Sequence, residues 1–256
     1  FPLTTLKNLT IKDIRESYEM SPDSDFYKYS LARYLFRPLS FYFAWVAIKL
    51  KVSPNQITLL SWLVLFLGCI NYATQYFDFE LFSFTMIFLW ALLDYVDGTM
   101  ARALSVRSKF GHFIDVVGAY YLFAFLPVAI AIGTSDDMLG RIAPVVLEYT
   151  GVSIFRQDLL LLGSIAAISN LLLRLTLLRG QVTFDVNVRD IDETSNAASL
   201  VAWVEALASP RGFFFPLLIF CDYFNALDLF VLIYAMYYCL SLLVYTPFYC
   251  FKNRDK

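Results

Sequence analysis

Charged side chains are scarce in this sequence, and their shortage is the first guide to its class. Lys, Arg, Asp and Glu make up 16% of the 256 residues, hydrophobic residues make up 59%, and the mean hydropathy is +0.61. A soluble domain of this length carries more charge. The formal net charge of −2 provides no general basic surface, so we expect no nucleic-acid partner. This composition predicts a membrane protein.

Paired cysteines and sequence repeats are also missing. The four cysteines show no C-x-x-C spacing, and each lies in an apolar run: Cys69, Cys221, Cys239 and Cys250. We therefore expect buried thiols rather than disulfides or zinc ligands. The first residue is Phe1 rather than Met, from which we expect a trimmed or processed chain, and no signal peptide is expected.

Long apolar runs are what the sequence has in quantity. A helix needs about 20 such residues to cross the hydrocarbon core of a bilayer. Six segments predict an all-α integral membrane protein with six transmembrane helices, at residues 56–77, 80–104, 109–133, 157–179, 212–227 and 228–250. A short polar turn near Asp222, Asn225 and Asp228 separates the last two. A polar loop at residues 181–210 is expected to contain a short helix at 197–208.

The segment before the first span is polar, with one shorter apolar run. Within residues 30–51 that run continues for about 12 residues after Pro38, which is too short for a span. We interpret it as an N-terminal amphipathic interfacial helix. Four of its basic side chains would reach the lipid headgroups: Arg33, Arg37, Lys49 and Lys51.

The basic residues also predict the orientation. If the amino terminus is cytoplasmic, all Lys and Arg residues except Arg141 and Arg156 fall in cytoplasmic segments, as the positive-inside rule requires. Both termini and the active site then face the cytoplasm. The expected organisation is a cytoplasmic and interfacial segment at 1–53, a transmembrane catalytic domain at 54–251, and a cytoplasmic tail at 252–256.

Three carboxylates lie at the ends of the second and third predicted spans, where an ionised group costs roughly 2.5–3.5 kcal/mol on insertion scales. One helix face, an arc of about 100°, holds two of them and two small residues: Asp94, Asp97, Gly98 and Ala101. Asp115 on the next predicted helix lies at the same depth. Such carboxylates suit Mg²⁺ or Mn²⁺. In the structural alternative they form ion pairs, with Arg102, Arg107 or Lys109.

The same stretch resembles the signature of the CDP-alcohol phosphotransferase family, D-x2-D-G-x2-A-R-x8-G-x3-D-x3-D. Seven fixed positions match over 22 residues: Asp94, Asp97, Gly98, Ala101, Arg102, Gly111 and Asp115. The segment SPNQIT, Ser53–Thr58, is similar to the one that commonly opens the first span of that family. The six-span layout and the amphipathic leader extend the resemblance over most of the chain.

The resemblance implies that an alcohol hydroxyl attacks the β-phosphorus of a CDP-linked donor and releases CMP. It implies two divalent cations, Mg²⁺ or Mn²⁺, held by Asp94, Asp97 and Asp115. It assigns a nucleotide-binding role to six further residues: Gly98, Ala101, Arg102, Gly111, Asn55 and Thr58. Helix capping by Ser53 or Asn55 is the alternative for the last two. The implied partners are a CDP-linked lipid, an alcohol acceptor, membrane lipids and a second copy in a homodimer.

The sequence departs from the signature at its last position, where the family's fourth aspartate is replaced by Ala119. In the family that aspartate coordinates metal and is the general base. Three explanations remain open: an engineered substitution that stops turnover, a natural enzyme with another base, and a natural relative without catalysis. His112 is a candidate substitute base, because His112, Asp115 and Ala119 share an arc of about 60° on one helix face. An interfacial histidine with a structural role is the alternative.

The acceptor alcohol is not specified by the sequence. Arg174, inside the fourth predicted span, and Arg211, at the start of the fifth, are candidates for binding a phosphorylated acceptor or other phosphates. Snorkelling to the interface also explains Arg174. The sequence leaves three alternative classes: a non-catalytic lipid- or nucleotide-binding relative, an intramembrane prenyltransferase, and an ion-coupled transporter. A prenyltransferase has two aspartate-rich motifs, whereas this sequence has one. A transporter has midplane sites and repeats, whereas these aspartates lie near the ends of predicted helices.

Overall fold

A computed structural model describes residues 9–19, 34–76, 81–106, 108–134, 156–184 and 214–252. Within these ranges the chain forms eight helices and no strand, which confirms the all-α prediction for them. The helices are α2 (Ile11–Glu19), α4 (Phe36–Lys49), α5 (Pro54–Thr74), α6 (Phe82–Ala103), α7 (Lys109–Gly133), α9 (Arg156–Phe184), α11 (Phe214–Tyr223) and α12 (Leu227–Lys252).

Five of these helices, α5, α6, α7, α9 and α12, are long and apolar enough to cross a membrane, as expected for a multi-pass membrane protein. The fifth predicted span, 212–227, corresponds to α11, whose described length is 10 residues. That is shorter than the roughly 20 residues that a crossing helix needs. Residues 185–213, which include the helix expected at 197–208, lie outside the described residues. A sixth span therefore stays a prediction.

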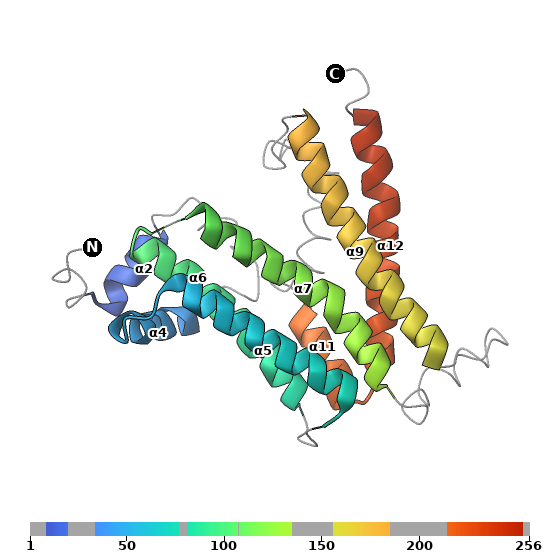
Figure 1. The fold of residues 1–256 in the computed structure, drawn as a ribbon, viewed down its shortest axis with the longest axis horizontal. Helices are drawn as coiled ribbons and strands as arrows, with labels where there is room; N and C mark the ends of the chain where they lie inside the picture. Colours follow the sequence, from blue (N-terminus) through green and yellow to red (C-terminus); the bar gives the residue numbers. More distant parts are fainter. Residues whose placement is uncertain are drawn as a thin grey trace.

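Helices α5, α6 and α7 run side by side, and α5 packs against both of the others (Figure 1). The start of α5 is set by a capping box, in which the Ser53 hydroxyl accepts from the Gln56 N–H and the Gln56 side chain accepts from the Ser53 N–H. Glycines allow the close approach of these helices. A Cβ added at Gly68 would lie 2.9 Å from Ile87 of α6, and one at Gly118 would lie 2.5 Å from the Trp62 indole nitrogen.

Helices α9 and α12 form a second unit that packs on the far end of α7 (Figure 1). The closest crossing is at Gly163 of α9, where an added Cβ would lie 2.7 Å from the backbone oxygen of Pro127. Pro127 lies inside α7 and is buried. The two units therefore meet backbone to backbone at a position where only glycine fits.

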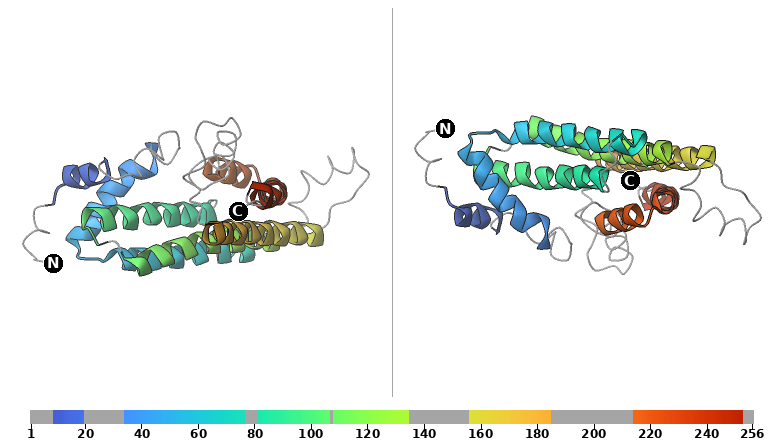
Figure 2. Two further views of the ribbon diagram at one scale, coloured as in Figure 1. Left: turned by 90° about the horizontal axis from the view of Figure 1, so that it is seen from above. Right: turned by 90° about the horizontal axis from the view of Figure 1, so that it is seen from below.

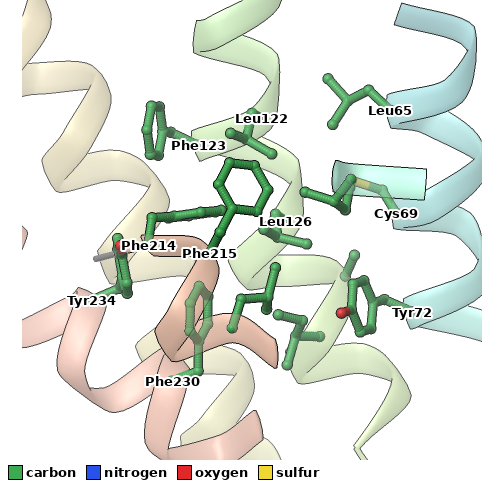
Figure 3. Close-up of a cluster of buried hydrophobic side chains, with 14 of the residues drawn as sticks. Leu65, Cys69, Tyr72, Leu122, Phe123, Leu126, Phe214, Phe215, Phe230 and Tyr234 are labelled. Atoms are coloured by element: carbon green, nitrogen blue, oxygen red, sulfur yellow. The ribbon is translucent and has the colours of Figure 1, made fainter. Parts of the chain in front are cut away.

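Aromatic side chains fill the space between the two units. Phe214 of α11 is fully buried, and its ring centroid lies 5.4 Å from that of Tyr234 and 5.9 Å from that of Phe123. Figure 3 shows part of this cluster, and its labelled residues are Leu65, Cys69 and Tyr72 from α5, Leu122, Phe123 and Leu126 from α7, Phe214 and Phe215 from α11, and Phe230 and Tyr234 from α12. Helices α4, α6 and α9 also contribute buried residues to the cluster. The buried thiol expected at Cys69 is confirmed.

A second apolar cluster lies where α5 begins and α6 ends, and helices α2 and α4 pack at this end of the molecule (Figure 2). Its buried members are Ile14, Ala44, Ala47, Ile48, Ile57, Val96 and Met100. The short helix expected after residue 30 is present as α4, which exposes Tyr42, Phe43 and Val46.

The prediction that Arg37 reaches the lipid headgroups is wrong. The residue is only 5% exposed, and its guanidinium carbon lies 4.4 Å from the Tyr18 ring centroid and 4.7 Å from that of Tyr95. Contacts with two aromatic faces stabilise the buried cation. Arg33 lies outside the described residues.

Candidate functional site

Three helix ends meet where the signature residues lie: the start of α5, the end of α6 and the start of α7. The Ser53 box caps α5, and the Ser108 hydroxyl caps α7 by accepting from the Gly111 N–H at 2.9 Å. A helix start carries partial positive charge and free N–H groups, so two such starts favour an anionic ligand nearby. The local folding of the motif thus provides a phosphate-compatible environment.

Asp97 is the buried acid of this region. It is 6% exposed, and its Oδ2 accepts a hydrogen bond of 2.5 Å from the Thr58 hydroxyl, which also contacts the Pro54 carbonyl oxygen at 3.2 Å. Thr58 was predicted to line a nucleotide pocket. In the structure it binds the carboxylate, so its role is to orient Asp97 from the neighbouring helix.

Of the three signature aspartates, Asp97 and Asp115 interact with each other. Asp115 of α7 is close enough to Asp97 of α6 for the two carboxylates to interact electrostatically. Asp94 is half-buried one turn earlier on α6. Among the residues that the structure describes, no group of three His, Cys, Asp or Glu side chains is close enough to hold a metal ion. The donor chemistry of paired carboxylates still fits a hard divalent cation, because two like charges in a membrane-embedded site favour a cation between them.

Arg102 lies over Gly98 at the same helix end. A Cβ added at Gly98 would lie 3.3 Å from Arg102 Nη2, so the missing side chain leaves space for the guanidinium. This cation also interacts electrostatically with Asp97. Ala101 is half-buried beside it. Gly98 therefore makes room for Arg102, whereas the sequence interpretation assigned that space to the nucleotide.

Asn55 and Gly111 lie together at the contact between α5 and α7. A Cβ added at Gly111 would lie 3.1 Å from Asn55 Oδ1 and 3.0 Å from Ser108 Oγ. Gly111 thus allows the two helix starts to approach each other. The capping alternative is confirmed for Ser53, since its side chain makes the reciprocal bonds at the start of α5.

Ala119 is half-buried one turn beyond Asp115 on α7. Its neighbour Gly118 packs against Trp62, which brings α5 close to this turn. His112, the candidate substitute base, is exposed in the first turn of α7. It lies about 10 Å along the helix axis from Ala119 at a rise of 1.5 Å per residue, so it is far from the position that the family's base would occupy.

Arg174 of α9 contacts two aromatic rings of α7. Its guanidinium carbon lies 5.0 Å from the Tyr120 ring centroid and 4.7 Å from that of Phe123, and its Nε donates to Asn170 Oδ1 at 2.9 Å. Arg211, the other candidate, lies outside the described residues.

The sequence interpretation missed α2. Tyr18 of this helix is buried, and its ring centroid lies 4.4 Å from the guanidinium carbon of Arg37 and 5.5 Å from that of Arg102. A local signal for the helix was present: Thr10 and Asp13 form a T-x-x-D capping box, and Ile14 and Tyr18 follow at helical spacing.

Together, the helices and the site define a multi-pass membrane protein. Its site contains carboxylates and an arginine and lies where α5 and α7 begin and α6 ends. The chain belongs to the CDP-alcohol phosphatidyltransferase family, whose family model matches residues 51–180. That range includes the whole signature and helices α5 to α7.

Two relatives share a shorter segment. A protein of Aquifex aeolicus (strain VF5), described as uncharacterized, is 39% identical over 67 residues, which is 26% of this chain and 33% of the relative. The archaetidylinositol phosphate synthase of Pyrococcus horikoshii is 33% identical over 67 residues, 26% of this chain and 34% of the relative. The chain thus matches about a third of the length of each of these relatives.

Proposed function

We propose that this chain transfers a phosphatidyl or other phospho-alcohol group from a CDP-linked donor, such as CDP-diacylglycerol, to an alcohol acceptor, and so acts in phospholipid biosynthesis. A bond forms between the acceptor oxygen and the β-phosphorus, and the bond from that phosphorus to the bridging oxygen breaks. CMP leaves with that oxygen, and the acceptor proton passes to a base. Family membership supports this reaction class.

The observation that carries the proposal is the buried Asp97 carboxylate, which is oriented by Thr58 and interacts electrostatically with Asp115 where two helix starts converge. Asp94, Asp97 and Asp115 would hold Mg²⁺ or Mn²⁺, with two cations expected from the family. When bound, such cations neutralise charge that develops on phosphate oxygens. Arg102 and the starts of α5 and α7 would orient the donor diphosphate.

Ala119 favours a second candidate, a nucleotide- or lipid-binding relative without turnover. An alanine provides neither a metal ligand nor a proton acceptor where the family has an aspartate. The proposed topology is common to both candidates: six spans, both termini in the cytoplasm, and the site facing the cytoplasm. Both candidates are also proposed to be homodimers.

The test is CMP release in detergent from CDP-diacylglycerol with Mg²⁺ or Mn²⁺ and a panel of acceptor alcohols. The unaltered chain is compared with Ala119→Asp, each with and without Asp97→Asn. Asp158→Asn, which changes an exposed acid at the start of α9, is the matched control. We expect turnover in Ala119→Asp, loss of that turnover with Asp97→Asn, and none of that loss with Asp158→Asn.

Each other outcome has a distinct meaning. Turnover by the unaltered chain requires a base other than residue 119. Metal-dependent CDP binding without turnover in either chain supports the non-catalytic candidate. Absence of both CDP binding and turnover contradicts the proposed function.

A further inference from the structure

The ring of Tyr18 contacts two guanidinium groups that come from different helices. Arg37 of α4 lies 4.4 Å from its centroid and Arg102 of α6 lies 5.5 Å from it. Cations over an aromatic face are attracted by its quadrupole, by about 0.5–1 kcal/mol at exposed sites and more where water is excluded. Tyr18 is 9% exposed, so this contact lies on the desolvated side of that range.

The position of Tyr18 is fixed by the rest of α2. Ile14, one turn earlier, is fully buried in the cluster that includes Met100 of α6. The Trp45 indole N–H of α4 donates to the Leu9 carbonyl oxygen at 3.1 Å, just before α2 begins. The helix is therefore attached just before its start to α4 and near its middle to α6, the helices that carry the two arginines.

Arg37 is held from a second side. Its guanidinium carbon lies 4.7 Å from the Tyr95 ring centroid, and Phe36 stacks on Tyr95 at 5.3 Å with an interplanar angle of 5°. The order Tyr18, Arg37, Tyr95, Phe36 thus joins α2, α4 and α6. In contrast to Arg37, Arg102 lies over Gly98 and interacts with Asp97, on the side of the candidate site.

We propose that Tyr18 is a positioning residue that fixes the Arg102 guanidinium over Gly98 for binding the diphosphate of a CDP-linked donor. An arginine side chain loses up to about 2 kcal/mol of rotamer entropy when it is ordered. The Tyr18 ring orders it before the ligand arrives, so less of that cost falls on binding. Arg37 contacts the same ring and adds a second positive charge beside Arg102. This inference rests on the proposed function.

The test measures CDP affinity of the full chain in detergent with Mn²⁺, by titration calorimetry, for three variants. Tyr18→Phe keeps the ring face and is expected to bind within about twofold of the unaltered chain. Tyr18→Leu removes the ring and is expected to weaken binding about fivefold. Tyr34→Leu is the matched control, because Tyr34 is 74% exposed, and it is expected to bind as the unaltered chain does.

A double-mutant cycle separates positioning from general destabilisation. In an Arg102→Gln background, Tyr18→Leu is expected to cause no further loss of CDP affinity. Additive losses would overturn the inference, as would equal CDP affinity of Tyr18→Leu and the unaltered chain. Should Tyr18→Leu fail to fold, Tyr18→Met, which also lacks a ring, replaces it in the cycle.

Competition with cytidine identifies the group that is bound. The Tyr18→Leu loss is expected for CDP and not for cytidine, which has no phosphate; an equal loss for both would contradict diphosphate binding. If the unaltered chain binds no CDP at all, the proposed function fails and this inference with it. If it binds CDP but Tyr18→Leu causes no loss, the inference alone fails.

Discussion

The Thr58 hydroxyl donates a hydrogen bond to the Asp97 carboxylate and so joins the first turns of α5 to the last turns of α6. Both residues are buried, at 4% and 6% exposure. The signature identifies Asp97 by sequence, and this hydrogen bond fixes the orientation of its carboxylate.

Thr58→Val keeps the shape of the side chain and removes the donor. Loss of a hydrogen bond to a buried acceptor costs about 1–3 kcal/mol. We expect a lower Tm in detergent and weaker Mn²⁺-dependent CDP binding, whereas Thr58→Ser, which keeps the hydroxyl, stays near the unaltered chain. Thermal unfolding and calorimetry of the three proteins measure both effects. Equal behaviour of the Val and Ser variants would show that the bond contributes nothing.

The sequence predicted the parts of the molecule that depend on short-range spacing. The long helices follow from runs of about 20 apolar residues, because a bilayer leaves no other way to satisfy the backbone of such a run. The shared face of Asp94, Asp97 and Gly98 follows from helical geometry alone. The break between α11 and α12 also agrees with the predicted polar turn, where Asn225 has a φ of 50°.

Contacts between distant segments could not be predicted from those patterns. Arg37 was assigned to the headgroups because it lies in a basic, amphipathic stretch, but the rings of Tyr18 and Tyr95 bury it. The space beside Gly98 was assigned to a ligand, but Arg102 occupies it in the structure. In each case the outcome depends on how helices pack, which a single sequence does not encode as a periodic pattern.

Gly163→Ala tests the crossing of the two helical units. In most helices this change stabilises the chain by roughly 0.5–1 kcal/mol. Here the added Cβ would lie 2.7 Å from the Pro127 carbonyl oxygen, a backbone atom that cannot move without shifting α7. We therefore expect a lower Tm, while the adjacent change Ser164→Ala, which removes from a half-buried residue a hydroxyl that bonds the Leu160 carbonyl oxygen within α9, has little effect. A Tm equal to or above that of the unaltered chain would contradict the crossing.

Arg174 is expected to bind a phosphorylated acceptor, so its replacement should raise the KM for that acceptor. A hydrogen bond to a charged group contributes about 1.5–3 kcal/mol, so its loss weakens binding about tenfold or more. In the Ala119→Asp background, Arg174→Gln should raise the KM for a phosphorylated alcohol while the KM for CDP-diacylglycerol stays within about twofold. Steady-state assays with each substrate varied measure this. A fall in kcat and Tm with both KM values unchanged would assign Arg174 to the α7–α9 contact alone.

The cap of α2 predicts a pH-dependent contribution to its docking. The Asp13 carboxylate accepts hydrogen bonds from the Thr10 N–H and the Thr10 hydroxyl. These bonds hold the pKa of Asp13 below its usual 3.8. A group whose pKa is lowered by folding stabilises the fold above its unfolded pKa, and this contribution is lost as the pH falls through the lowered value. Amide exchange in α2 should therefore be faster in Asp13→Ala than in the unaltered chain above about pH 4, and the two should converge at lower pH as the carboxylate is protonated. A difference that persists below the lowered pKa would mean that the charge of Asp13 does not stabilise the helix. Tyr18 lies near the end of α2. The CDP affinities of Asp13→Ala and the unaltered chain, compared above about pH 4, therefore measure how far the position of Tyr18 depends on the cap.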